Sequence, residues 1–89
     1  SEHPALFRNE LKARQLSWIE APPEAFPLSC TSKIRYRQKD SPCVIQSIKE
    51  GHAHITFPTP QRAVTPGQSI VFIGTTNVLE AELFYETAR

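Results

Sequence analysis

Positively charged residues occupy every second position in one segment of the chain, namely Lys33, Arg35, Arg37 and Lys39. Side chains at alternate positions of a β-strand point to the same face, about 6.5 to 7 Å apart, which is close to the spacing of phosphates along a nucleic-acid strand. In a strand, this row could therefore hold several phosphate groups. A solvent-exposed face, on which Lys and Arg protect a sheet edge from pairing with another chain, explains the same pattern.

A second candidate site consists of Gln61 and Arg62, which precede a turn signal at residues 65–68. A guanidinium group can hold a phosphate through two parallel hydrogen bonds. It can also hold nearby backbone carbonyl oxygens. The residue types leave both interpretations open.

Cysteine and histidine residues give weaker signals. Cys30 and Cys43 could form a disulfide, but two cysteines in a chain without secretory features favour reduced core thiols. Neither has a neighbouring histidine or a helix N-terminus to lower its pKa. His52 and His54 share a strand face, yet no further Cys or His lies at a spacing that would complete a metal site. The sequence therefore predicts no catalytic residue and no metal site.

Short β-strands must position these residues, because apolar and polar side chains alternate over several short runs. The basic row alternates with Cys30, Ser32 and Ile34, which indicates a strand from 29 to 39. The run from 43 to 49 does not alternate perfectly and requires a β-bulge. The other predicted strands lie at 52–57, at 69–73, where the strand is buried, and at 78–85, with short strands and a turn within 6–19.

Proline and glycine residues mark the connections. Proline has no N–H and restricts the residue before it, so Pro22-Pro23 indicates a crossover. Further turns or breaks are expected at 40–42, at Glu50-Gly51, at 58–60, at 65–68 (type II) and at 74–77. Five or six short strands between such turns indicate an all-β fold. A small antiparallel β-barrel of about six strands is favoured over a sandwich, because closure leaves no exposed edge.

Length and composition are consistent with one domain. A chain of 89 residues holds a single hydrophobic core. Within this one domain we expect a lead-in segment, 1–28, with short strands and a Pro-rich crossover, and a barrel body, 29–89. The absence of Met indicates a processed product or, as we favour, a fragment of a longer protein. Because the chain has neither an apolar run of roughly 20 residues nor a signal peptide, we expect a cytoplasmic protein without membrane contact.

The last predicted strand carries acidic side chains, Glu80 and Glu82, on the face opposite its apolar residues. Like charges at alternate positions of the basic row repel one another and cost stability unless an anion or an acidic strand neutralises them. Pairing of the acidic strand with the basic strand is therefore the main alternative to nucleic-acid contact.

Three blocks of the sequence resemble the C-terminal domain of the tRNA-specific 2-thiouridylases (MnmA/TrmU family) in order and spacing: residues 33–38, Pro42-Cys43 and residues 60–72. Residues 6–7 and 17–19, followed by Pro22-Pro23, resemble the entry into that domain, so the resemblance covers nearly the whole chain. The segment 77–82 departs from the family, which tends to have a Gly-rich strand there.

The resemblance implies an ATP-dependent enzyme that replaces the C2 oxygen of the wobble uridine in certain tRNAs with sulfur. ATP, with Mg²⁺, and the catalytic cysteines would belong to an N-terminal ATP-pyrophosphatase domain, since the isolated glycines of this chain form no phosphate-binding loop. The chain alone is therefore expected to be inactive, to hold no cofactor and to bind tRNA. The implied RNA-binding residues are Lys33, Arg35, Arg37, Lys39, Gln61 and Arg62.

Two further partners follow from the resemblance, the N-terminal catalytic domain of the same protein and a sulfur-relay protein. An alternative function is a structural or protein-interaction barrel that packs on either of them. In that case the basic row meets protein carboxylates.

Overall fold

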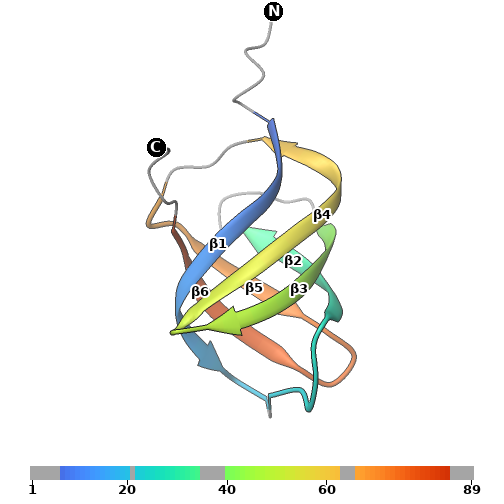
Figure 1. The fold of residues 1–89 in the computed structure, drawn as a ribbon, viewed down its shortest axis with the longest axis vertical. Coiled ribbons are helices and arrows are strands. Elements are labelled where there is room, and N and C mark those ends of the chain that lie inside the picture. Colours follow the sequence, from blue (N-terminus) through green and yellow to red (C-terminus); the bar gives the residue numbers. More distant parts are fainter. Residues whose placement is uncertain (1–6, 21, 35–39, 63–65, 85–89) are drawn as a thin grey trace, which may run out of the picture.

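Six β-strands make up the described part of the computed structural model, which covers residues 7–20, 22–34, 40–62 and 66–84. They are β1 (Phe7–Trp18), β2 (Leu28–Ile34), β3 (Ser41–Lys49), β4 (His52–Arg62), β5 (Ser69–Ile73) and β6 (Val78–Phe84). Figure 1 shows how they cross one another around a common interior. No helix occurs among these residues, and hence none that is long and apolar enough to cross a membrane.

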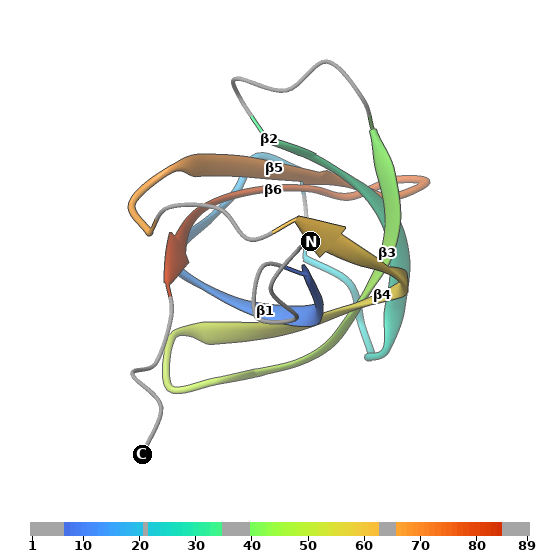
Figure 2. The ribbon, with the colours of Figure 1, turned by 90° about the horizontal axis from the view of Figure 1, so that it is seen from above.

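The strands close into a barrel in the order β1-β4-β3-β2-β5-β6, with every neighbouring pair antiparallel. Figure 2 looks along the barrel and shows the strands encircling its interior. β1 lies between β4 and β6, so the chain must cross from β1 to β2 on the opposite side. The fold confirms the predicted antiparallel barrel and the crossover at Pro22-Pro23.

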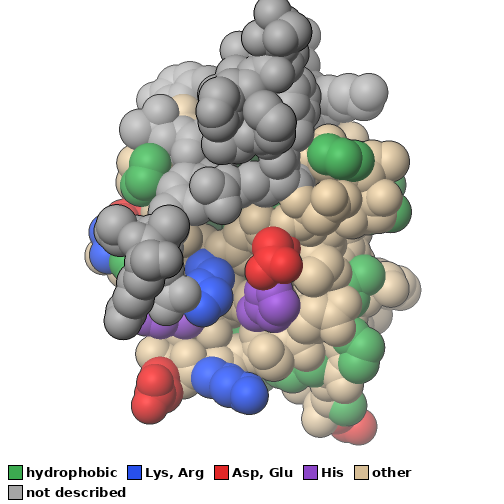
Figure 3. All heavy atoms as spheres, turned by 45° about the horizontal axis from the view of Figure 1, so that its top comes forward, with side chains coloured by type: hydrophobic (Ala, Val, Ile, Leu, Met, Phe, Trp, Pro, Cys, Tyr) green, Lys and Arg blue, Asp and Glu red, His purple; other side chains and the backbone are tan. Residues whose placement is uncertain are grey.

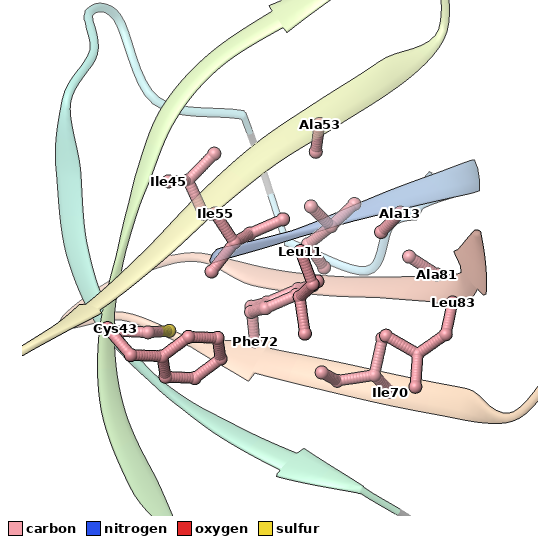
Figure 4. Close-up of a cluster of buried hydrophobic side chains, with 12 residues drawn as sticks. Leu11, Ala13, Cys43, Ile45, Ala53, Ile55, Ile70, Phe72, Ala81 and Leu83 are labelled. Atoms are coloured by element: carbon pink, nitrogen blue, oxygen red, sulfur yellow. The ribbon is translucent and has the colours of Figure 1, made fainter. Parts of the chain in front are cut away.

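Apolar side chains from β1, β3, β4, β5 and β6 fill the interior, where they point toward one another (Figure 4). Leu28, Cys30 and Ile34 of β2 are partly buried and pack against this cluster. The alternation predicted for β6 is confirmed, because Leu79, Ala81 and Leu83 are buried and Glu80 is exposed. Full burial of a Leu, Ile or Phe side chain stabilises a fold by about 1.5–3 kcal/mol. The buried apolar residues are Leu11, Ala13, Cys43, Ile45, Ala53, Ile55, Phe57, Ile70, Phe72, Leu79, Ala81 and Leu83.

β1 is a single strand of 12 residues, where the sequence predicts short strands and a turn. Its pairing with β6 shifts register around Gln15, which adopts a φ of 54°. Leu11 and Ala13 are buried before this bulge, and Leu16 and Trp18 pack against the same core after it. The bulge therefore explains why the apolar residues of this segment do not alternate regularly.

The hairpin of β3 and β4 contains the bulge that the sequence predicts. Its register shifts between Ile45 and Ser47, so Ile45 and Ile48 both face the core although they lie three positions apart. Glu50 and Gly51 form the turn, with φ values of 53° and 76°. Two successive positive φ values are typical of a two-residue type I′ turn, which the glycine predicts and the glutamate does not.

β4 continues through Pro58 and Pro60 to Arg62, so the predicted end of the strand at Phe57 is wrong. The predicted break of the ladder at these prolines is confirmed, because pairing with β1 skips residues 57–60, where the register is irregular. In this stretch Asn9 Nδ2 donates a hydrogen bond to the Phe57 carbonyl oxygen (3.3 Å). Proline, which has no N–H, is tolerated where the regular ladder is interrupted.

The connection between β2 and β3 differs from the prediction. Ser32 of β2 pairs with Ser41 of β3, so Ser41 and Pro42 belong to a strand and do not form a turn with Asp40. β2 is described as far as Ile34, and the rest of the predicted strand, residues 35–39, lies outside the described residues.

β5 is buried on one face only, although the sequence predicts a buried strand. Ile70 and Phe72 face the core, whereas Ser69 and Ile73 are exposed. An antiparallel strand in a small barrel has one face on the core and the other on solvent, so five consecutive residues cannot all be buried. The predicted Pro66-Gly67 turn precedes this strand, with Gly67 at a φ of 93°.

Candidate nucleic-acid interface

Four strand termini meet at one end of the barrel: the ends of β2 and β4 and the beginnings of β1 and β3 (Figure 1). Ser32 Oγ donates to the Ser41 carbonyl oxygen (3.2 Å), which joins β2 to β3. Ser41 Oγ in turn donates to Gln61 Oε1 (3.1 Å), which joins β3 to the end of β4. The described end of β2 and the end of β4 therefore lie at the same end of the barrel, on either side of the beginning of β3.

Lys33 is the sequence-predicted cation whose side chain the structure describes. It occupies an exposed position on β2, directly opposite Val71 of β5, which is opposite Glu80 of β6. It lines an open groove of about 540 Å³ with Ser17 and Glu82, among others. Within the described part of the chain, Lys33 makes neither a hydrogen bond nor an ion pair.

The acidic strand does not neutralise the basic one by pairing with it, because β5 lies between β2 and β6. Glu82 is engaged from the other side, by β1: Arg14 donates to Glu82 Oε2 from both Nε (2.9 Å) and Nη2 (2.7 Å). The Arg14 guanidinium also lies over the Phe84 ring, 4.9 Å from its centroid. The alternative that the acidic strand pairs directly with the basic strand is therefore wrong. The sequence did not reveal the Arg14–Glu82 pair, because the two residues lie far apart in the chain and no local spacing indicates their contact.

Gln61 fixes the end of β4 through both ends of its amide group. Its Oε1 accepts the hydrogen bond from Ser41, and its Nε2 donates to the Thr59 carbonyl oxygen (3.1 Å). In this arrangement Gln61 positions neighbouring backbone segments. The backbone of Arg62 pairs with Phe7, while the side chain of Arg62 and the predicted residues Arg35, Arg37 and Lys39 lie outside what the structure describes.

His52 and His54 lie on the outer face of β4, each against a different partner. His54 Nε2 is 3.2 Å from Glu10 Oε1, and the His52 ring stacks on Phe84 with centroids 4.8 Å apart. Figure 3 shows positive, negative and histidine side chains close together on this face. Within the described residues, no group of three or more His, Cys, Asp or Glu side chains could hold a metal ion. The histidine positions are explained by packing and pairing on the surface.

Cys30 and Cys43 are free thiols, in line with the prediction, but they are also direct cross-strand neighbours. Their Sγ atoms lie 3.6 Å apart. The hydrogen bond between the two thiols lowers the pKa of Cys30, whereas the same bond and burial raise the pKa of Cys43. The sequence analysis considered only a histidine or a helix N-terminus as a cause of a lowered thiol pKa, whereas here the cause is the second thiol.

Comparisons with known proteins agree with this architecture. The family model described as an aminomethyltransferase β-barrel domain matches residues 8–79. A tRNA-specific 2-thiouridylase MnmA from Protochlamydia amoebophila is 56% identical over 72 residues, covering 81% of this chain and 19% of the relative. The tRNA-specific 2-thiouridylase MnmA of Francisella philomiragia is 46% identical over 71 residues, covering 80% of this chain and 20% of the relative.

The chain thus spans about a fifth of the length of these curated relatives. The matched residues include β1 to β5 and the beginning of β6, so the similarity extends over most of the barrel. The chain belongs to the family of aminomethyltransferase β-barrel domains and corresponds to the C-terminal β-barrel domain of the tRNA-specific 2-thiouridylases.

Proposed function

We propose that this domain holds tRNA through its phosphates while a separate, N-terminal domain of the same cytoplasmic protein carries out ATP-dependent 2-thiolation of the wobble uridine. The relatives are tRNA-specific 2-thiouridylases about five times as long as the matched region, which leaves room for such a domain. Catalysis, ATP and Mg²⁺ would belong to that domain, and the barrel alone would be inactive.

The observation that carries the proposal is that the described end of β2, which residues 35–39 follow in the sequence, and the end of β4, where Arg62 lies, are at the same end of the barrel. The Ser41–Gln61 hydrogen bond ties the start of β3 to the end of β4, beside the end of β2. Five of the ten Lys and Arg residues and one of the nine acidic residues belong to 33–40 and 61–62, so these segments carry +4 and the rest of the chain −3. Such a polarised charge distribution attracts a polyanion to one end of the domain.

Phosphate contacts would orient the tRNA without reading its sequence, because phosphates are the same at every position. Lys33, Arg35, Arg37, Lys39 and Arg62 would make these contacts. Gln61 would act by holding β3 against β4, since both ends of its amide are engaged in the barrel. If about three to four phosphates are neutralised, the slope of log affinity against log salt should be about −2 to −4.

Charge reversal tests this proposal. We expect Arg35→Glu combined with Arg37→Glu to weaken tRNA binding by at least on the order of tenfold near 0.1 M salt and to make the salt slope shallower by about 2, because each lost phosphate contact removes about one unit. The measurement is a titration of fluorescently labelled tRNA by anisotropy between about 50 and 200 mM salt.

The matched control is Lys49→Glu, which reverses an exposed charge at the opposite end of β3. It should leave the affinity and the salt slope close to those of the unchanged chain. The double variant reverses two charges and Lys49→Glu reverses one. A loss of log affinity in Lys49→Glu that is about half the loss in the double variant would show that only net charge matters and would contradict a localised interface. Tight binding that does not respond to salt would contradict phosphate contact altogether.

A second candidate, docking of the barrel onto the catalytic domain or a sulfur-relay protein, is favoured by two exposed isoleucines. Ile19 and Ile73 are 57% and 46% exposed. Both are adjacent to Val78, since the Ile19 N–H donates to the Val78 carbonyl oxygen (2.8 Å) and Ile73 pairs with Val78. In the full-length protein, Ile19→Ser combined with Ile73→Ser should weaken docking and preserve tRNA affinity. Arg35→Glu combined with Arg37→Glu should weaken tRNA binding and preserve docking.

A further inference from the structure

Two cysteines face each other across the β2–β3 hairpin in the described part of the barrel. Cys30 and Cys43 are directly paired residues of neighbouring antiparallel strands, and their Sγ atoms are 3.6 Å apart. Directly opposite residues in such strands have Cα atoms about 4.5 or 5.5 Å apart, which lies within the range that a disulfide accepts. The sulfur atoms would need to approach by about 1.5 Å, which side-chain rotation can supply while the strands stay in place.

The pair is also accessible from solvent on one side. Cys30 and Cys43 line an open pocket of about 360 Å³ together with Ser29, Pro42 and Phe57, among others. Cys43 is only 3% exposed, whereas Cys30 is half-buried. A reagent that enters the pocket should therefore reach the sulfur of Cys30 before that of Cys43.

We propose that Cys30 and Cys43 form a redox-active dithiol site that reacts with low-molecular-weight disulfides, Cys30 as the attacking thiol and Cys43 as the resolving thiol. The site goes beyond tRNA binding and does not depend on it. The hydrogen bond from the Cys43 thiol stabilises the Cys30 thiolate and lowers the Cys30 pKa, which fits the order of the two steps.

In the first step, the Cys30 thiolate attacks one sulfur of a disulfide R–S–S–R, a Cys30–S–S–R bond forms, and R–S⁻ leaves and takes up the proton that Cys30 lost. In the second step, Cys43 loses its proton to solvent base and attacks Sγ of Cys30, and the second R–S⁻ leaves and is protonated. The two cysteines lose two electrons and two protons, and the disulfide is reduced to two R–SH. The product is a cross-strand disulfide that ties β2 to β3.

The test treats the full chain with glutathione disulfide and quenches samples with acid for intact-mass measurement. The unchanged chain should lose the mass of two hydrogens and carry no lasting glutathione. Cys43→Ser should instead accumulate one glutathione on Cys30, because the resolving thiol is missing. Cys30→Ser should react at least on the order of tenfold more slowly than Cys43→Ser, because Cys43 is almost completely covered.

A measurement on the unchanged chain guards against variants that fail to fold. The ratio of intramolecular disulfide to dithiol in a glutathione redox buffer should be at least about tenfold higher in the folded chain than in the chain unfolded by urea, since only the folded barrel holds the thiols together. Equal ratios in the two states, equal reaction rates of the two serine variants, or stable glutathione on the unchanged chain would each overturn the proposal.

Discussion

The turn between β3 and β4 offers a test in which two neighbouring substitutions should change stability in opposite directions. Glu50 adopts a φ of 53°, in the left-handed region that costs a residue with a side chain roughly 1–2 kcal/mol. Asparagine enters this region more readily and is preferred at the first position of a type I′ turn. Glu50→Asn should therefore raise the free energy of unfolding by about 1 kcal/mol, or about 4–8 °C in Tm.

Gly51→Ala should lower the free energy of unfolding by about 1–2 kcal/mol. Gly51 has a φ of 76°, and a Cβ atom built at this position meets no heavy atom within 4 Å. The loss would therefore come from the backbone conformation alone and not from a steric clash. Because the turn lies at the end of the barrel opposite the ends of β2 and β4, neither substitution should change tRNA affinity.

Urea unfolding followed by the fluorescence of Trp18, the single tryptophan of the chain, measures these effects. Glu50→Gln is the matched control, because it removes the charge and keeps an ordinary side chain in the left-handed conformation. It should stay within about 0.5 kcal/mol of the unchanged chain. If Glu50→Asn is no more stable than Glu50→Gln, or if Gly51→Ala is as stable as the unchanged chain, backbone strain does not govern this turn.

Two further predictions follow from contacts between strands. In the Arg14–Glu82 pair, two guanidinium nitrogens donate to one carboxylate oxygen, and the side chains are 41% and 24% exposed. A double-mutant cycle with alanine should give a coupling of about 0.5–1 kcal/mol that shrinks in high salt, whereas additive effects would contradict it. Because the Cys43 thiol lowers the pKa of Cys30, alkylation of Cys30 by iodoacetamide should begin at a lower pH than alkylation of an ordinary thiol. Cys43→Ala should shift this onset to higher pH. Peptide mapping across a pH series measures the extent of alkylation.

Sequence patterns correctly predicted which residues are buried in strands whose apolar and polar side chains alternate without interruption. In β6 the apolar residues alternate with glutamates, and the structure places them as that pattern predicts. In β3 the irregular spacing of Val44, Ile45 and Ile48 correctly indicated a bulge. The same reasoning missed β1, because a bulge at Gln15 moves the apolar positions from odd to even residue numbers within one strand.

Register between strands was harder to predict, and the candidate cysteine site depends on it. A turn at residues 40–42, as the pattern predicts, would place Cys43 opposite Lys39 at the end of the preceding strand and far from Cys30. The observed pairing of Ser32 with Ser41 instead brings Cys30 opposite Cys43. A shift of a few residues in a hairpin thus decides which side chains meet, and turn residues alone did not fix it.

The position of β1 in the ring has a consequence for how the domain is made. β1 pairs with β4 and β6, and its Ala13 lies opposite Leu83 of β6. One edge of β1 therefore has no partner strand until β6 is available. On a ribosome, the barrel could close only after β6 has left the exit tunnel. Pairing between such distant residues makes folding slow, and a newly synthesised chain would expose the edges of β1 to other chains during that interval.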